Sequence, residues 1–192
     1  MRSCLLLAAT LLLAPLVLAG TQQAPEITDG TNDVQPDSAA GVCTARGAPE
    51  IDVVRAWFDP GPDVVSVSVE VVDLSHRAFD GEGFSLDVGF HSGTDAFTLW
   101  NALGPGPADN FSALFVDHAD GTSEGHAIRW STSGNVVTAE IPRAYLPGSA
   151  LTHVRASGRL SQPGVLGFYV VGMPWFCDTA PDVGYGQDVP LG

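Results

Sequence analysis

The sequence contains no lysine, and its eight basic residues, all arginine, face 22 aspartates and glutamates, for a net charge of −14. Proteins that hold nucleic acid neutralise phosphates with clustered Lys or Arg, so this balance excludes nucleic acid and disfavours anionic membrane surfaces as partners. Charged residues make up only 16% of the chain and apolar residues 45%. That composition excludes a disordered acidic tail and predicts one compact hydrophobic core.

Long apolar runs are also scarce, since only the run from Leu5 to Ala19, after Arg2, approaches membrane length. Its fifteen residues fall short of the roughly 20 that span a bilayer as a helix. Val17 and Ala19 place small residues at the −3 and −1 positions before Gly20, which is typical of a signal-peptide cleavage site. The sequence predicts a signal peptide over 1–19, an exported product and no transmembrane anchor in the mature chain. An uncleaved anchor is the alternative.

Cysteine is rare, and after Cys4 in the leader only Cys43 and Cys177 remain. An even pair in an exported chain favours a disulfide between them, which would close almost the whole mature chain into one loop. A metal site would need further ligands nearby, and neither cysteine has a Cys or His within four residues. Two free thiols are the remaining alternative.

The mature chain divides into a polar lead-in at 20–47 and a single domain at 48–192, closed by the C-terminal segment. In the domain, apolar and polar residues alternate with period two, as in Val65, Val67, Val69 and Val71. About nine strands separated by turn clusters are predicted: 51–58, 65–71, 84–90, 96–103, 111–117, 126–131, 136–141, 151–156 and 165–171. One helical turn is expected at 143–146. The pattern predicts an all-β fold, an antiparallel two-sheet β-sandwich.

The order of several segments resembles a known family. The segments are Pro25–Asp33, Pro49–Phe58, Val71–Leu74, Val136–Arg143 and Asp178–Asp182. They resemble the secreted DOMON-like or carbohydrate-binding-module-9-like β-sandwich, found alone or appended to exported proteins. The resemblance implies a jelly-roll-like sandwich with a binding or accessory role, since relatives bind sugars and some related sandwiches bind haem or calcium.

Two acidic segments are candidate calcium ligands. Asp29 and Asp33 flank a turn near the N-terminus, and Asp178 and Asp182 lie beside Cys177. A bond between the two cysteines would draw these segments together, and Ca²⁺ takes carboxylate and carbonyl oxygens from irregular loops. The alternative is that these aspartates simply stabilise turns through nearby backbone N–H groups.

Tryptophan side chains are candidates for carbohydrate binding, because their flat rings stack on the apolar face of a sugar. Trp57 shares a predicted strand face with Arg55, so it is expected to point outward. Trp100 beside Asn101 suggests a second, polar sugar-binding corner. Ordinary core packing is the competing interpretation for large aromatic side chains.

No catalytic motif stands out. Gly121–Gly125 matches the G-x-S-x-G sequence of a nucleophile elbow, which needs a buried strand before the serine and a helix after it. Here polar turn residues precede Ser123 and a strand pattern follows it, so the match is interpreted as accidental. Asn110-Phe111-Ser112 is an N-glycosylation triplet, which matters if the host glycosylates exported proteins. The sequence thus favours a noncatalytic, secreted binding module, with calcium as its one candidate cofactor. An exported hydrolase using paired carboxylates and a purely structural envelope protein remain the alternatives.

Overall fold

The computed structural model describes residues 20–31, 49–75, 83–104, 110–161, 176–181 and 184–192. Within these ranges the chain forms twelve strands and one 3-10 helix, η2 (Arg143–Tyr145). None of the helical structure there has the length and apolar character needed to cross a bilayer.

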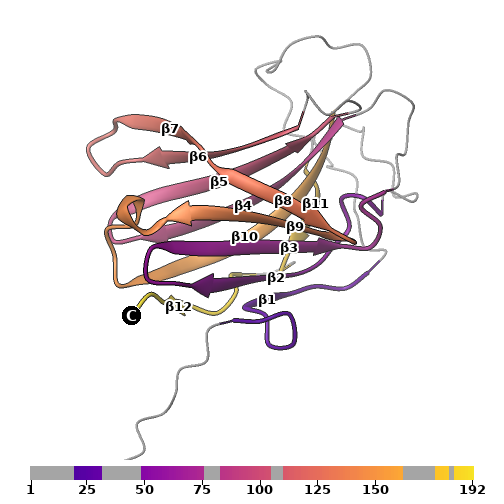
Figure 1. The fold of residues 1–192 in the computed structure, drawn as a ribbon, viewed down its shortest axis with the longest axis horizontal. Coiled ribbons are helices and arrows are strands. Elements are labelled where there is room, and N and C mark those ends of the chain that lie inside the picture. Colours follow the sequence, from indigo (N-terminus) through magenta and orange to yellow (C-terminus); the bar gives the residue numbers. More distant parts are fainter. Residues whose placement is uncertain (1–19, 32–48, 76–82, 105–109, 162–175, 182–183) are drawn as a thin grey trace, which may run out of the picture.

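The strands form two sheets, which lie one behind the other in Figure 1. The five-stranded sheet has the order β1 (Ile27–Thr28), β2 (Val53–Pro60), β3 (Val64–Val71), β9 (Val136–Pro142) and β8 (Arg129–Ser133). The second sheet has the order β11 (Phe176–Ala180), β10 (Ala150–Ser161), β4 (Gly83–Ser92), β5 (Asp95–Leu103), β6 (Phe111–Asp117) and β7 (Ser123–Ala127), with β12 (Val189–Pro190) pairing β10 as its seventh strand. Every strand pairing within the sheets is antiparallel, so the predicted all-β sandwich is confirmed.

The core fills the space between the sheets, as the alternating pattern predicts. The four valines Val65, Val67, Val69 and Val71 are all buried on β3. Phe58 of the five-stranded sheet meets Phe90 of the seven-stranded sheet edge to face, with ring centroids 6.2 Å apart. Phe90 also stacks on Phe97 at 5.2 Å. These contacts join the sheets through apolar surface, the main stabilising term for such a fold.

Two segments differ from the sequence-based expectation. The segment predicted as one strand at 126–131 is divided at the buried Ile128, and β7 and β8 belong to different sheets. The lead-in, expected to be polar and extended, contributes the buried Ile27 to the core and pairs β1 with β2. The predicted strand at 165–171 lies outside the described residues, which contain twelve strands where about nine were expected in the whole chain. The helical turn predicted at 143–146 is confirmed as η2.

An irregularity in β2 decides which side chains of that strand face outward. The pairing register of β2 with β3 shifts between Val53 and Arg55. Before the shift Val53 is buried, and after it the buried residues are Ala56 and Phe58. An inserted residue in one strand reverses its alternation, so Trp57 points away from the core.

Candidate functional site

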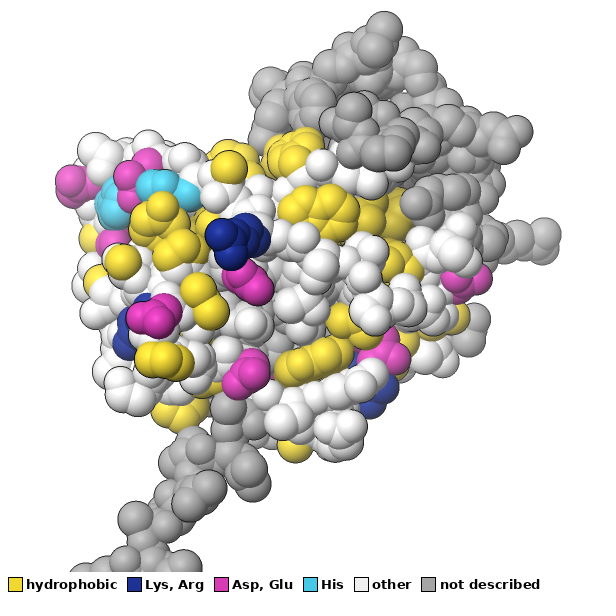
Figure 2. Space-filling view, viewed as in Figure 1, with side chains coloured by type: hydrophobic (Ala, Val, Ile, Leu, Met, Phe, Trp, Pro, Cys, Tyr) yellow, Lys and Arg dark blue, Asp and Glu magenta, His cyan; other side chains and the backbone are white. Residues whose placement is uncertain are grey.

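The outer face of the five-stranded sheet carries a continuous row of side chains across four strands. Trp57 of β2 pairs with Ser68 of β3, Ser68 pairs with Thr138 of β9, and Thr138 pairs with Ser131 of β8. Residues directly opposite each other in a sheet project on the same side, so one indole and three hydroxyls lie in line. We call these four residues the Trp57 row. Figure 1 looks onto this sheet, and Figure 2 shows its surface in the same orientation as backbone and uncharged polar side chains interspersed with hydrophobic patches and a few charged side chains.

The Trp57 row is held in place by local contacts. The hydroxyls of Ser68 and Thr138 are hydrogen-bonded at 2.9 Å. Ser68 is buried, whereas Trp57 and Thr138 are half-buried and Ser131 is exposed. The row therefore offers an indole face and the hydroxyls of Thr138 and Ser131 to solvent from a rigid strand framework, the property that a preformed ligand surface needs.

One flank of the row is closed by an ion pair. Arg55 Nε donates to Glu70 Oε2 at 2.6 Å, and Gln22 Nε2 donates to the same oxygen at 3.0 Å. Arg55 also donates to the backbone carbonyl of Gln22, which ties β2 to the segment before β1. The Arg55 hydrogen bond lowers the pKa of Glu70. Glu70 is therefore a charged and occupied acceptor, and the flank is structural.

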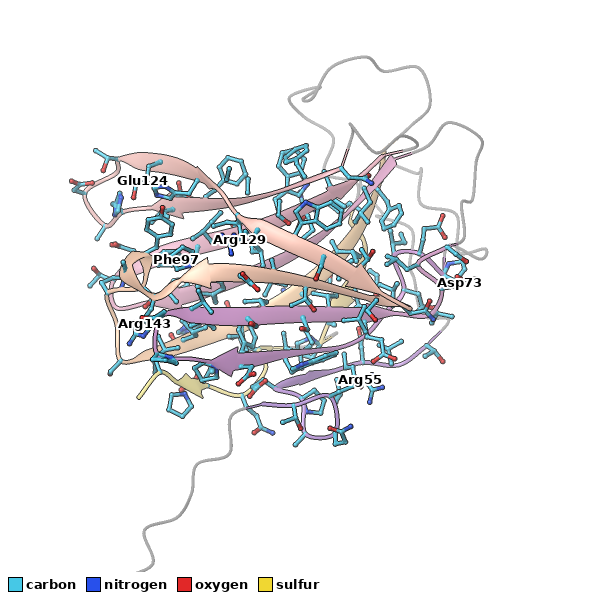
Figure 3. All side chains as sticks on the ribbon, in the orientation of Figure 1. Arg55, Asp73, Phe97, Glu124, Arg129 and Arg143 are labelled. Carbon is cyan, nitrogen blue, oxygen red and sulfur yellow. The ribbon has the colours of Figure 1, made fainter. Side chains whose placement is uncertain are left out.

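The opposite flank is a shallow groove. Its lining residues come from β3, the β7–β8 connection and β9: Val64, Ala127, Ile128, Arg129, Glu140 and Pro142. Arg129 lies opposite Glu140 in the β8–β9 register, and its side chain is exposed. Among the described residues no carboxylate lies within ion-pair distance of Arg129, which is labelled in Figure 3. The groove thus offers a cation, a carboxylate and apolar surface to a ligand that occupies it.

The structure separates the predicted pair Trp100 and Asn101. Trp100 points outward from the seven-stranded sheet, where its ring centroid lies 5.1 Å from that of Phe111 and 6.0 Å from that of Phe115. Asn101 points into the core, where it is buried, donates to Leu86 O at 3.0 Å and accepts a hydrogen bond from Ser112. Successive residues of a strand project to opposite faces, so the corner expected from their adjacency does not form.

Asp87 is a polar residue of this second outer face that the sequence reasoning missed. It lies opposite Trp100 in the β4–β5 register and is buried. Its Oδ2 atom lies 2.8 Å from Arg159 Nε. Burial raises the pKa of Asp87 to about 6, against the opposing effects of the Arg159 charge and a hydrogen bond from Ser85. A strand pattern treats such an aspartate as an ordinary outward residue, so only the tertiary packing reveals it.

The candidate calcium ligands are partly placed. Asp29 and Asp178 both lie beside β2: the Asp29 amide donates to Val54 O at 3.0 Å, and the buried Asp178 accepts from the Val53 amide at 2.6 Å. The other two, Asp33 and Asp182, lie outside the described residues, as do Cys43 and the side chain of Cys177. In the described part of the chain, no three His, Cys, Asp or Glu side chains are grouped so as to hold a metal ion.

Asn110 of the glycosylation triplet begins a described segment. Its Oδ1 atom accepts the Gly104 amide at 2.8 Å. The third residue, Ser112, is buried, and its hydroxyl bonds Asn101 inside the sandwich. The second residue, Phe111, packs on Trp100.

No family model matches the chain, and neither a curated protein nor a solved structure does. The resemblance to DOMON-like and carbohydrate-binding-module-9-like domains therefore stays a prediction.

Proposed function

We propose that this protein is a noncatalytic, exported binding module that holds a glycan on the outer face of its five-stranded sheet. The Trp57 row carries the proposal, since it sets one indole in line with the solvent-facing hydroxyl groups of Thr138 and Ser131. An indole provides apolar surface for the C–H face of a sugar ring, and Ser or Thr hydroxyls both donate and accept hydrogen bonds.

The dimensions of the sheet fit a short oligosaccharide. Neighbouring strands lie about 4.8 Å apart, so the row from β2 to β8 spans roughly 14 Å. A sugar chain lying across the strands would begin at Trp57 and end beside Arg129 in the groove. The exposed guanidinium there favours a sugar that carries a carboxylate, because planar bidentate pairing is the preferred geometry of arginine.

The competing enzymatic hypothesis also has a place on this face. Asp59 and Glu140 both pair with Ser66, from opposite sides. Two strand spacings separate their backbones by roughly 9.6 Å, a distance from which the side chains can reach the carboxyl spacing of an inverting glycosidase, roughly 6.5 to 9.5 Å. Binding is preferred because the face is open, whereas electrostatic catalysis is strongest in a closed site that admits only the reacting water.

The test is binding of the exported chain to a panel of polysaccharides by affinity electrophoresis. Trp57→Ala should weaken binding at least about tenfold, the equivalent of roughly 1.4 kcal/mol, because the stacking surface is lost. Trp57→Phe should keep most of the affinity. Phe115→Ala is the matched control, since this 36% exposed aromatic side chain lies on the outer face of the other sheet.

Unchanged binding by Trp57→Ala would disprove the role of the row. A wild-type chain that binds none of the polysaccharides would overturn glycan binding and favour the purely structural role. Release of reducing sugar that disappears in both Asp59→Asn and Glu140→Gln would establish the hydrolase instead.

A further inference from the structure

A cluster of histidines and carboxylates lies at one end of the sandwich, away from the Trp57 row. Its members come from β5, the end of β6 and β7: Asp95, His118, Glu124 and His126. We call these four residues the histidine–carboxylate cluster. Glu124, labelled in Figure 3, lies on the β6–β7 hairpin near the end of the molecule.

The cluster lies on the inner side of its sheet. Glu124 pairs with Val116 and His126 pairs with Leu114, and both apolar partners are buried in the core. Because paired residues share a face, the two β7 side chains point toward the opposite sheet. The His126 ring stacks on Tyr145 of η2, with ring centroids 4.1 Å apart and an interplanar angle of 15°. The cluster therefore bridges the two sheets where β7 ends.

Four short contacts connect the cluster. His118 Nδ1 lies 3.0 Å from Asp95 Oδ2, and His118 Nε2 lies 3.4 Å from Glu124 Oε1. The same glutamate oxygen lies 3.1 Å from His126 Nε2. The Ala119 amide also donates to Asp95 Oδ1 at 3.3 Å. These contacts join the start of β5 to the β6–β7 hairpin.

The protonation state of His118 decides whether these contacts are all attractive. Both of its ring nitrogens face carboxylate oxygens, which only accept hydrogen bonds when ionised. A neutral imidazole carries one N–H, so it satisfies one carboxylate and turns a lone pair toward the other. The imidazolium carries two N–H groups and satisfies both.

We propose that the histidine–carboxylate cluster is a proton-sensitive clasp that fastens the β6–β7 hairpin to the β5 turn when His118 is protonated. Loss of that proton turns one of its two attractive contacts into a lone-pair repulsion. The hairpin then becomes easier to open locally, without unfolding of the sandwich. This device is independent of glycan binding and of the Trp57 row.

The carboxylates that face the clasp favour its protonated form, whereas His126 competes with His118 for Glu124. Asp95 comes from β5, Asp120 from the hairpin connection and Glu124 from β7, and His126 stacks on Tyr145 of η2. Asp117 at the end of β6 accepts a hydrogen bond from the Ser123 hydroxyl instead. The hydrogen bond with Asp95 raises the pKa of His118, and the same bond lowers the pKa of Asp95.

The sign of the pH dependence follows from these shifts. The pKa of His118 is higher in the folded protein than its ordinary value of 6.5. Its protonation therefore stabilises the fold fully below pH 6.5, and this stabilisation is lost as the pH rises through the pKa of the folded state. The contact with His126 lowers the pKa of Glu124, so its contribution is present above the ordinary 4.5 and is lost as pH falls. The clasp is therefore closed in mildly acidic solution and open in alkaline solution.

Amide hydrogen exchange of the wild-type chain tests the clasp. The reporters are the His118 amide, bonded to Thr122 O, and the Gly121 amide, bonded to His118 O. After correction for intrinsic exchange, protection should fall about two- to fivefold between about pH 6 and pH 8, the range expected for exposed ion pairs. The imidazole NMR titration of His118 in the same sample should give a pKa above the ordinary histidine value.

The variant His118→Asn should abolish the pH dependence of hairpin protection, because an amide does not titrate. His153→Asn is the matched control, since the exposed His153 has a φ of 54°, a left-handed conformation that asparagine tolerates. It should leave the dependence intact. Protection that does not change with pH in the wild type, an equal change in His118→Asn, or a His118 pKa at or below its ordinary value would each overturn the clasp.

Discussion

At the scale of single residues, the burial of Asp87 beside Arg159 has the largest effect on a pKa. Asp87 is buried beneath the outer face of the seven-stranded sheet with only Arg159 as its cationic partner within the described ion pairs. Moving a carboxylate out of water costs free energy, and the single cationic partner Arg159 offsets only part of that cost. The result is the raised pKa of about 6.

That pKa predicts how stability changes with pH. Since the folded pKa of about 6 exceeds the ordinary 3.8, the wild type should lose about 2 kcal/mol of unfolding free energy between pH 4 and pH 7, relative to Asp87→Asn. Urea unfolding of both proteins across this range measures the difference. Asp59→Asn, at an exposed position on the other sheet, should follow the wild type. Parallel curves for wild type and Asp87→Asn would contradict the assignment.

Asn101 shows at the same scale why neighbours in sequence need not share a site. Its side chain is used inside the sandwich, between the Leu86 carbonyl and the Ser112 hydroxyl. Trp100 is used outside, against Phe111. Buried polar groups need partners, so Asn101 has a structural reason to be polar that is unrelated to a ligand.

At the scale of elements, close packing of β10 under β2 restricts the sequence. Gly158 of β10 lies so near the turn before β2 that an added Cβ atom would stand 2.1 Å from the Ile51 carbonyl oxygen. Because the obstructing atom belongs to the backbone, a side-chain rotation cannot relieve the contact. The glycine is therefore required by the approach of the two elements.

Gly158→Ala should lower the free energy of unfolding by about 2 kcal/mol or more, since the strands must move apart. Gly89→Ala on the neighbouring strand β4 is the matched control, because its Cβ would meet nothing closer than the Phe97 carbonyl oxygen at 3.9 Å. Thermal and urea unfolding of the two variants give the comparison. Equal stabilities would show that β10 shifts freely.

The strands themselves were largely predictable, and their assignment to sheets was not. Alternation of apolar and polar residues is a local property, so β3, β5 and β6 lie close to their expected positions. The division at Ile128 depends on that side chain reaching the core from between two sheets. The outward direction of Trp57, expected from the sequence, is set in the structure by the register shift in β2.

At the scale of the whole molecule, we infer that Cys43 and Cys177 form a disulfide after export. They are 134 positions apart, and the described part of β11 that contains Cys177 pairs with β10. Closing so long a loop reduces the entropy of the unfolded chain.

Reduction of the exported protein should therefore lower its unfolding free energy by about 4 to 5 kcal/mol, less any strain in the bond. Denaturant unfolding with and without reductant measures this, and Cys43→Ser with Cys177→Ser should match the reduced wild type. An intact mass that shows two free thiols in the native protein would disprove the bond. Chelation with EDTA followed by calcium addition separately tests the calcium hypothesis, and an unchanged melting temperature would refute a stabilising ion.

The sequence by itself determined the class of fold, because alternation and turn residues are local signals, and it determined the acidic charge balance from which the prediction against nucleic acid follows. It also identified Trp57 as an outward residue. Only the tertiary structure decided which side chains meet: the Trp57 row and the Asp87–Arg159 pair join strands distant in sequence, and the histidine–carboxylate cluster joins three consecutive strands. Register and sheet membership place those residues together, and both depend on how the complete core packs rather than on any one segment.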